Sequence, residues 1–206
     1  MRQNTRITNQ IKQLTLFDGC NGELLEKMLS DEGVSCGIGE WEHFRGICVL
    51  LKGTAMVVRN NDNGMMLMSK LKRGDVFGAA TILNDGDFFA PHIQPCGQIQ
   101  VLCIAEKVWL RWLREDYSLM KNYLHYVNAR LQFLNIRLDA LSKSNIECRV
   151  LSFLRASARD GLCKIESYTE LAMMLCVGRA SLYRALDALE QNGQLVRYKK
   201  EITLRG

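Results

Sequence analysis

Residues 167–193 read SYTELAMMLCVGRASLYRALDALEQNG, and this stretch decides the fold. It opens with a capping box, Ser167-Tyr168-Thr169-Glu170, in which the Ser hydroxyl can accept a hydrogen bond from the Glu amide while the Glu side chain reaches back. The pattern predicts a short helix after this box, a turn at 176–178, and a second helix over 179–192 that Gly193 ends. Two helices around a tight turn form a helix-turn-helix.

A β-hairpin is predicted directly after the second helix, with strands 195–198 and 201–204 joined across Lys199-Lys200. Helix-turn-helix followed by hairpin is the winged arrangement of DNA-binding domains. Arginine can make two hydrogen bonds to guanine O6 and N7, and wing lysines can contact phosphates. The predicted DNA-binding residues are Ser167, Arg179, Ala180, Ser181, Tyr183, Arg184, Lys199 and Lys200. The alternative is that Arg179 and Arg184 form an ordinary solvated face with Asp187 and Glu190.

A regular apolar stripe precedes this segment. Its residues are spaced alternately by three and four positions, as the a and d positions of a heptad are, with no Gly or Pro between them. The members are Tyr117, Met120, Leu124, Val127, Leu131, Leu134, Leu138 and Leu141. One amphipathic helix packing on its own domain could produce such a stripe, but its length and regularity favour a two-stranded coiled coil and hence a homodimer.

The region from Gly39 to about Ile104 is predicted to be all-β. Short apolar or β-branched runs alternate with turn signals, of which 60–64, Asn-Asn-Asp-Asn-Gly, is the strongest. The expected strands are 47–51, 54–59, 65–71 and 98–104. Closely spaced short strands of this kind indicate a small sandwich or barrel.

Composition and charge set the class. The chain has 206 residues, 48% of them hydrophobic and 24% charged, with a net charge of +5, which is compatible with nucleic-acid binding without requiring it. It has no apolar run of about 20 residues and no signal peptide at its start, so we expect a cytoplasmic protein with no membrane partner. None of the eight cysteines forms a C-x-x-C pair, which excludes the usual zinc and iron–sulfur motifs. We expect free thiols that act as small core residues.

The segment from Glu170 to Leu186 resembles the helix-turn-helix of the Crp/Fnr transcription factors. Further segments fall at family positions in family order: Leu16-Phe17-Asp18-Gly19, Gly39-Glu40, Leu51-Lys52-Gly53, Gly74-Asp75-Val76-Phe77-Gly78 and 144–149. The resemblance implies an α+β protein with an N-terminal β-roll (jelly-roll-like) sensor domain over 1–115, a long dimerisation helix over 116–142, and a C-terminal winged helix-turn-helix over 143–206. It implies double-stranded DNA as partner, read as an inverted repeat, and RNA polymerase as a candidate partner.

Two residues depart from the family pattern. Ala180 stands where the family often has Glu, so this position cannot accept from cytosine N4 and the DNA site should differ from the common one. Cys176 stands at the turn position usually held by Gly, which is unfavourable by about 1 kcal/mol if that residue needs a positive φ.

The family's cyclic-nucleotide site is not matched. Its binding members carry an acidic residue and an Arg-Ser or Arg-Thr pair after the Phe-Gly turn, whereas Phe77-Gly78 is followed by Ala79-Ala80-Thr81 and the pair's place falls at about Phe89-Ala90. No Lys or Arg lies between Gly74 and Lys107, and a buried phosphate without a cation is unfavourable. We therefore expect neither cyclic AMP nor cyclic GMP to bind.

Other effectors stay open. Only Cys20 lies in the first 35 residues, so the N-terminal cysteine cluster of the iron–sulfur members is absent. The three histidines, His43, His92 and His125, are interpreted as ordinary surface or core residues, although haem is not excluded. A pocket of Met56, Met66, Phe77 and Phe89 would suit an apolar or aromatic molecule, or haem.

Two other function classes were weighed. A metal-dependent cupin enzyme needs clustered His and Glu ligands, which three scattered histidines do not supply, so we expect no enzyme and no metal site. A thiol-based redox regulator of the same fold is the alternative function, with Cys176 beside the DNA-reading helix as its best switch.

Overall fold

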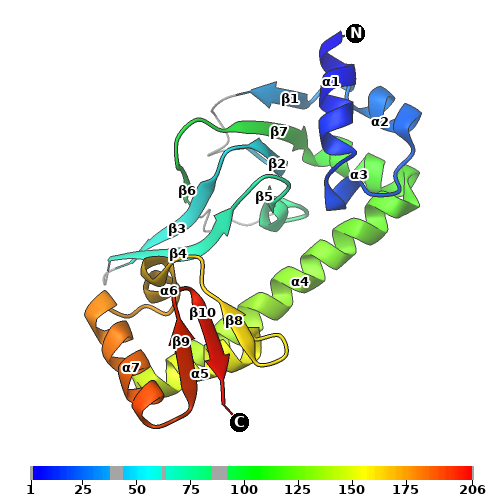
Figure 1. The fold of residues 1–206 in the computed structure, drawn as a ribbon. Coiled ribbons are helices and arrows are strands. Elements are labelled where there is room, and N and C mark those ends of the chain that lie inside the picture. Colours follow the sequence, from blue (N-terminus) through cyan, green and yellow to red (C-terminus); the bar gives the residue numbers. More distant parts are fainter. Residues whose placement is uncertain (1, 38–43, 62–63, 85–91, 206) are drawn as a thin grey trace. The chain divides into compact units, whose positions relative to one another are not determined.

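The computed structural model describes residues 2–37, 44–61, 64–84 and 92–205. The chain divides into two compact units. The first comprises Met1–Val58 and Met68–Ala129, and the second comprises Arg59–Leu67 and Arg130–Gly206. Helix α4 (Tyr117–Ser142) starts in the first unit and ends in the second (Figure 1).

The strands of the predicted all-β region form two antiparallel sheets. One has the order β1-β7-β2-β5, and the other has the order β4-β3-β6. The strands are β1 (Val34–Gly37), β2 (Gly46–Lys52), β3 (Ala55–Asn61), β4 (Gly64–Leu71), β5 (Val76–Phe77), β6 (His92–Pro95) and β7 (Gln100–Ala105). The helical elements of this region are α1 (Arg2–Ile11), η1 (Thr15–Phe17), α2 (Gly22–Met28), η2 (Ala79–Thr81) and α3 (Glu106–Glu115).

Strand β2 is buried on both faces, which explains its unbroken apolar run. Because side chains alternate along a strand, Ile47, Val49 and Leu51 pack on the helices, in the cluster that holds Trp109 and Trp112. Cys48 and Leu50 point the other way, into the space between the two sheets. The sheet of β2 and β7 therefore separates two apolar cores.

The start of α4 is fixed to the first unit by polar contacts. Asp116 accepts from the amides of Leu119 and Asn21, at 3.0 and 3.2 Å, and so caps the helix. Tyr126 donates from its hydroxyl to the Val76 carbonyl at 2.7 Å. The face of α4 that carries Leu119 is consequently buried, and the heptad stripe lies on other faces of the helix.

The C-terminal part of the second unit is the predicted winged helix-turn-helix. Its elements are α5 (Ile146–Ser157), β8 (Leu162–Lys164), α6 (Tyr168–Met174), α7 (Arg179–Gln191), β9 (Leu195–Tyr198) and β10 (Glu201–Leu204). The two helices, the turn and both wing strands lie where the sequence predicts them. Leucines of all three helices form one core, in which Ala172 is almost fully buried. The predicted fold class, α+β, is confirmed.

Several elements were missed or misjudged. The prediction omitted β8, which adds a third strand to the wing in the order β8-β10-β9, and it omitted β1 and the helices α1 to α3.

The expectation that the cysteines are core residues holds for Cys48, Cys103 and Cys163. It is wrong for three others, which are exposed thiols because they lie on solvent-facing turns or helix faces: Cys96, Cys148 and Cys176.

The described residues contain neither a membrane-spanning helix nor a cluster of metal-binding side chains. Among the helices of residues 2–37, 44–61, 64–84 and 92–205, none is both long and apolar enough to cross a membrane. Within the same ranges, no three His, Cys, Asp or Glu side chains gather as a metal would require.

Candidate nucleic-acid interface

The first helix of the motif starts at its predicted cap. The Oγ of Ser167 accepts from the Glu170 amide at 3.3 Å, which is the Ser half of the capping box. The ring of Tyr168, the first helical residue, lies 5.5 Å from that of Tyr183 on α7. The cap therefore sets where α6 starts, and Tyr168 connects α6 to the second helix.

The turn between the helices holds Cys176 in the left-handed region, with φ +53. The neighbouring amide of Val177 donates to the Ala172 carbonyl at 3.0 Å, which closes the turn. A side chain with a Cβ is disfavoured in this conformation by about 1 kcal/mol. The departure from Gly seen in the sequence thus falls at a position where Gly would be less strained.

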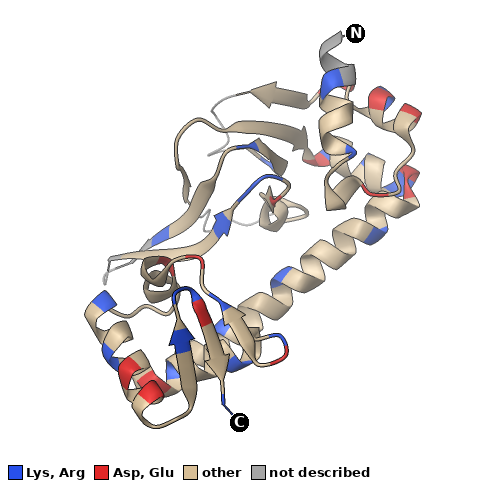
Figure 2. Cartoon of the chain, viewed as in Figure 1, with Lys and Arg blue, Asp and Glu red and all other residues tan. Residues whose placement is uncertain are grey.

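Helix α7 has one buried and one exposed face. Leu182, Ala185, Leu186 and Leu189 are buried in the core. The exposed side chains at its start are those of Arg179, Ala180, Tyr183 and Arg184, while Ser181 is half-buried and accepts from the Arg184 guanidinium at 3.2 Å. Basic residues stand at the start of the helix and acidic ones nearer its end (Figure 2). The first two turns thus present a basic and polar face to solvent.

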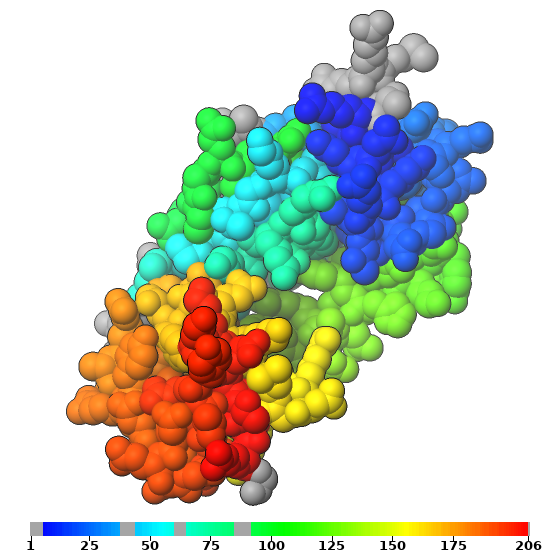
Figure 3. Space-filling view, viewed as in Figure 1, coloured from blue at the N-terminus to red at the C-terminus, as the bar shows by residue number. Residues whose placement is uncertain are grey.

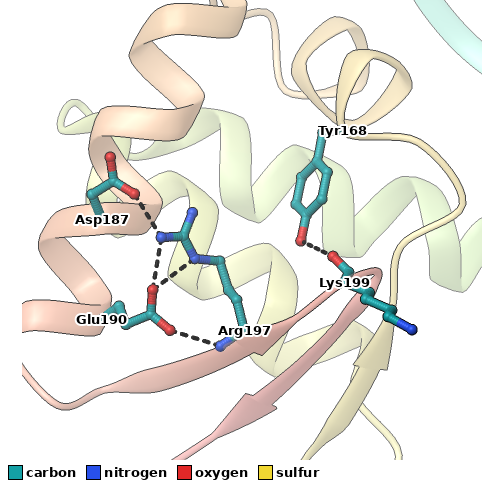
Figure 4. A network of polar contacts seen from close by, with 5 residues as sticks. All are labelled: Tyr168, Asp187, Glu190, Arg197 and Lys199. Carbon is teal, nitrogen blue, oxygen red and sulfur yellow. Dashed lines mark hydrogen bonds and ion pairs between the residues drawn. The ribbon is translucent and has the colours of Figure 1, made fainter.

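Arg197 of β9 occupies the acidic end of α7 (Figure 4). Its guanidinium lies 2.6 Å from Asp187 and 2.7 Å from Glu190, and its backbone amide donates to Glu190 at 2.8 Å. The amide and the guanidinium of Arg197 lower the pKa of Glu190. Burial works against the charged guanidinium, but the bonds to both carboxylates raise the pKa of Arg197.

This network separates the acidic residues of α7 from the arginines at its start. Asp187 and Glu190 are engaged by the wing strand rather than by the arginines at the start of α7. Within the part of the chain that the structure describes, neither Arg179 nor Arg184 forms an ion pair. Both guanidiniums therefore keep their charge available at the surface.

The wing tip carries two exposed cations. Lys199 has φ +53 in the two-residue turn, and Lys200 follows it. The hydroxyl of Tyr168 donates to the Lys199 carbonyl at 3.0 Å, so the tip is attached to the start of α6 (Figure 4). The hairpin, coloured red, lies beside the orange helix α7 in Figure 3. Wing and helix are held together by Tyr168 on one side and Arg197 on the other.

The end of α6 is held by two arginines that the sequence analysis did not single out. Arg137 of α4, almost fully buried, donates from Nε to the Met174 carbonyl at 2.9 Å. Arg149 of α5 donates to the Leu175 carbonyl at 3.2 Å. Cations at a helix C-terminus are favourable because carbonyls there lack partners. Burial lowers the pKa of Arg137, and the electrostatic interaction with Cys176 opposes that shift.

A surface cleft of about 490 Å³ lies between the start of α5 and α7. Its lining residues are Ser144, Asn145, Ile146, Glu147, Ser181, Arg184 and Ala185. Asn145 caps α5 by accepting from the Glu147 amide at 2.7 Å. The sequence pointed here only through the family match at 144–149. The cleft joins Arg184 to a helix N-terminus, two groups that attract anions, although the Glu147 carboxylate opposes them.

The heptad stripe of α4 is exposed to a degree unusual for large apolar side chains. Leu131 is 53% and Leu138 68% exposed. Tyr117, Leu124 and Leu134 are also exposed, and Met120, Val127 and Leu141 are half-buried. The helix packs its other faces on the two cores, so the stripe is not explained by packing within the chain.

Of the described residues of the predicted effector pocket, only Phe77 belongs to a buried core. Phe77 is buried in the core between the sheets. Met56 alternates with Ala55 and Val57 along β3 and so lies on the opposite face from them, and Met66 is half-buried on β4. Phe89, like His43, falls outside the described residues.

Comparison with known proteins agrees with this geometry. No family model matches the chain. The cAMP-activated global transcriptional regulator CRP of Pasteurella multocida is 22% identical over 166 residues, 76% of this chain and 79% of that protein. The catabolite activator protein of Thermus thermophilus has a TM-score of 0.52 at 19% identity, covering 93% of both chains. A CooA variant from Carboxydothermus hydrogenoformans has a TM-score of 0.64 at 16% identity, covering 87% of this chain and 90% of that one.

The resemblance to the Crp/Fnr regulators is thereby confirmed. Solved structures of this group share the fold across nearly the whole chain, and the curated relative aligns over three quarters of it. The cyclic nucleotide in the relative's name is a property of that relative.

Proposed function

We propose that the chain is a sequence-specific DNA-binding transcription regulator of the Crp/Fnr type, acting in the cytoplasm as a homodimer and having no enzymatic activity. One observation carries the proposal. The exposed start of α7 presents Arg179 and Arg184 without ion-pair partners among the described residues, on a helix whose two acidic residues pair with Arg197. A helix of this kind enters the major groove with its N-terminal residues toward the base edges.

Direct reading of bases falls to the two arginines. Each guanidinium can pair with O6 and N7 of a guanine, and each such pair contributes about 1–3 kcal/mol of discrimination. Ala180, exposed beside them, offers no acceptor to cytosine N4, so its facing base pair is loosely specified. Tyr183 and Ser181 complete the contact surface.

Phosphate contacts fall to the wing. Lys199 and Lys200 are exposed at its tip, and the Tyr168 bond fixes the tip beside α6. Phosphate contacts position a protein on the duplex without reading sequence. Ser167, which caps α6, lies at the same end of this surface.

The homodimer is supported by the exposed stripe from Tyr117 to Leu141. A second copy packed in parallel along it would bury these side chains and place two α7 helices about a two-fold axis. Such a dimer binds an inverted repeat with half-sites about one helical turn apart. RNA polymerase remains a candidate partner of the bound dimer.

Control by cyclic nucleotides is not part of this proposal. Residues 75–106 contain no Lys or Arg to pair with a phosphate. An apolar or aromatic effector near Phe77, or haem, is the open possibility, and no iron–sulfur centre is expected.

A thiol switch at Cys176 is the second candidate function. The observation favouring it is an exposed thiol in the turn directly before the helix that would read DNA. Oxidation there should change DNA affinity, and Cys176→Ala should abolish the change. Equal affinity in reductant and in mild oxidant would exclude this switch.

The main proposal is tested by selecting bound sequences from random DNA with the full-length protein and its variants. Arg184→Ala should relax the preference at one position in each half-site. Lys199→Ala should keep the motif but weaken all binding, with the salt slope lowered by about one unit per lost phosphate contact. Arg155→Ala, an exposed arginine of α5, is the matched control and should change neither.

The opposite pattern would refute the docking. If Arg184→Ala leaves the motif unchanged while Lys199→Ala alters it, the assigned roles are reversed. If the wild type selects no motif at all, the chain is not a sequence-specific regulator.

A further inference from the structure

Two buried cysteines face one another inside the β-roll. Cys48 of β2 and Cys103 of β7 are direct partners in the antiparallel register. Their sulfur atoms are 2.7 Å apart, and the residues are 2% and 6% exposed. No local pattern predicts this pair, because 55 positions separate its members.

The strand geometry at this pair suits a covalent link. Antiparallel partners alternate between pairs that exchange backbone hydrogen bonds and pairs that do not. The Glu106 amide donates to the Arg45 carbonyl at 3.3 Å, and the Leu50 amide donates away from β7, to the Asp75 carbonyl, at 2.9 Å. Counting along the strands from either bond, Cys48 and Cys103 form a pair that exchanges no backbone hydrogen bonds. Such pairs have Cα atoms about 4.5 Å apart, within the range of about 4.4–6.8 Å that disulfides need.

The surroundings are those of an apolar core rather than of a metal site. Leu50, Val57, Phe77 and Val101 belong to the same cluster as the two cysteines. A metal ion held tetrahedrally between two thiolates would keep the sulfurs about 3.8 Å apart if each bond is about 2.3 Å long. The observed separation is shorter than this and closer to the sulfur–sulfur bond of about 2.0 Å.

We propose that Cys48 and Cys103 are an oxidation site that closes to an intramolecular disulfide when the protein meets a small peroxide such as hydrogen peroxide. One of the two cysteines attacks a peroxide oxygen as its thiolate, the O–O bond breaks, and that cysteine becomes a sulfenic acid while the other oxygen takes up the thiol's proton and leaves as water. The sulfur of the second cysteine then attacks the first, the S–O bond breaks, and a second water leaves. Two thiols lose two electrons and two protons, and the peroxide is reduced to two waters.

The hydrogen bond between the thiols couples their ionisation. It lowers the pKa of Cys103 and raises the pKa of Cys48, and either sulfur can be its donor. The thiolate is the nucleophile in cysteine oxidation. Either cysteine can therefore attack the peroxide, and the other then resolves the sulfenic acid.

Burial determines which oxidant can act. Neither side chain is accessible to a protein or peptide disulfide, whereas a small neutral peroxide can enter a core during local opening. The resulting bond would join β2 to β7 inside the β-roll and stabilise this unit. The inference rests on the strand pairing, the sulfur separation and the burial of the pair, and it does not require the proposed function.

The test uses the full-length protein, fully reduced and then exposed to limiting hydrogen peroxide. After denaturation and alkylation of the remaining thiols, peptide mass analysis should find the peptides of Cys48 and Cys103 joined, with two hydrogens lost. A dithiol reductant should separate them. Cys48→Ala should abolish this link, whereas the matched control Cys163→Ala, a buried cysteine of the other unit, should leave it intact.

Oxidation of the exposed Cys176 thiol serves as the internal measure of how much oxidant reached the protein. If Cys48 and Cys103 are both still alkylated at the dose that oxidises Cys176, the proposal is overturned. A link from Cys103 to any other cysteine also overturns it. Peptide mapping of the wild type decides the question even if the alanine variant fails to fold.

Discussion

Replacing Leu131 by Lys tests the homodimer where the stripe is most informative. Burial of a whole Leu side chain is worth about 1.5–3 kcal/mol, and Leu131 is 53% exposed in the single chain. About half of that value, roughly 1 kcal/mol, is therefore still to be gained in each copy. Leu131→Ala should then weaken the dimer by about 2 kcal/mol, or roughly 30-fold. Leu131→Lys should weaken it further, because it places two like charges in the seam.

Sedimentation across the micromolar range measures this change, with circular dichroism to confirm that helix content is kept. Gln132→Lys is the matched control because it adds the same charge one residue away, at an exposed position off the stripe. We expect wild type and Gln132→Lys to be dimers and Leu131→Lys to be monomeric, with weak DNA binding.

Two results would refute this reasoning. A monomeric wild type at micromolar concentration would show that the stripe has another purpose. Equal disruption by Leu131→Lys and Gln132→Lys would show that charge on α4, rather than the apolar seam, controls assembly.

Three further predictions concern the effector and the DNA-binding unit. Calorimetric titration with cyclic AMP or cyclic GMP should give no specific heat, because residues 75–106 lack a cation for the phosphate, and micromolar affinity for either would contradict this. Cys176→Gly should raise the free energy of unfolding by at most about 1 kcal/mol, because it relieves the positive φ at this position. Part of the gain is lost because Gly has greater chain entropy in the unfolded state. A lower unfolding midpoint in denaturant would show that the turn is not strained. Arg197→Met should lower both the melting temperature and the affinity for DNA, because the wing loses its ion pairs with Asp187 and Glu190. The control Arg155→Met should leave both quantities unchanged. Equal effects of the two substitutions would rule out a specific role of the network.

The helix-turn-helix was predictable because its signals are local. The cap at Ser167, the turn before Arg179 and the stop at Gly193 each act within a few residues of themselves. The wing strands were equally predictable, since alternation over four residues marks a strand with one buried face. Local chemistry therefore specified this unit almost completely.

The missed features depend on residues far apart in the chain. Strand β8 has only three residues, too few for a period, and it pairs with β10 about 40 positions later. The role of Arg197 is not visible in the sequence, because its partners Asp187 and Glu190 lie on another element, α7. The facing thiols of Cys48 and Cys103 arise from strand register, which a single sequence does not reveal. The sequence could not supply these pairings, whereas the missed helices α1 to α3 are local elements whose pattern lies within each helix.

The buried guanidinium of Arg137 makes the helix-turn-helix sensitive to the state of α4. Arg137 lies between Leu134 and Leu138 of the stripe, yet its Nε holds the last turn of α6 through the Met174 carbonyl. A rotation of α4 about its own axis would move this donor away from its acceptor. The same short segment of α4 therefore carries both the exposed apolar stripe and the support for the end of α6.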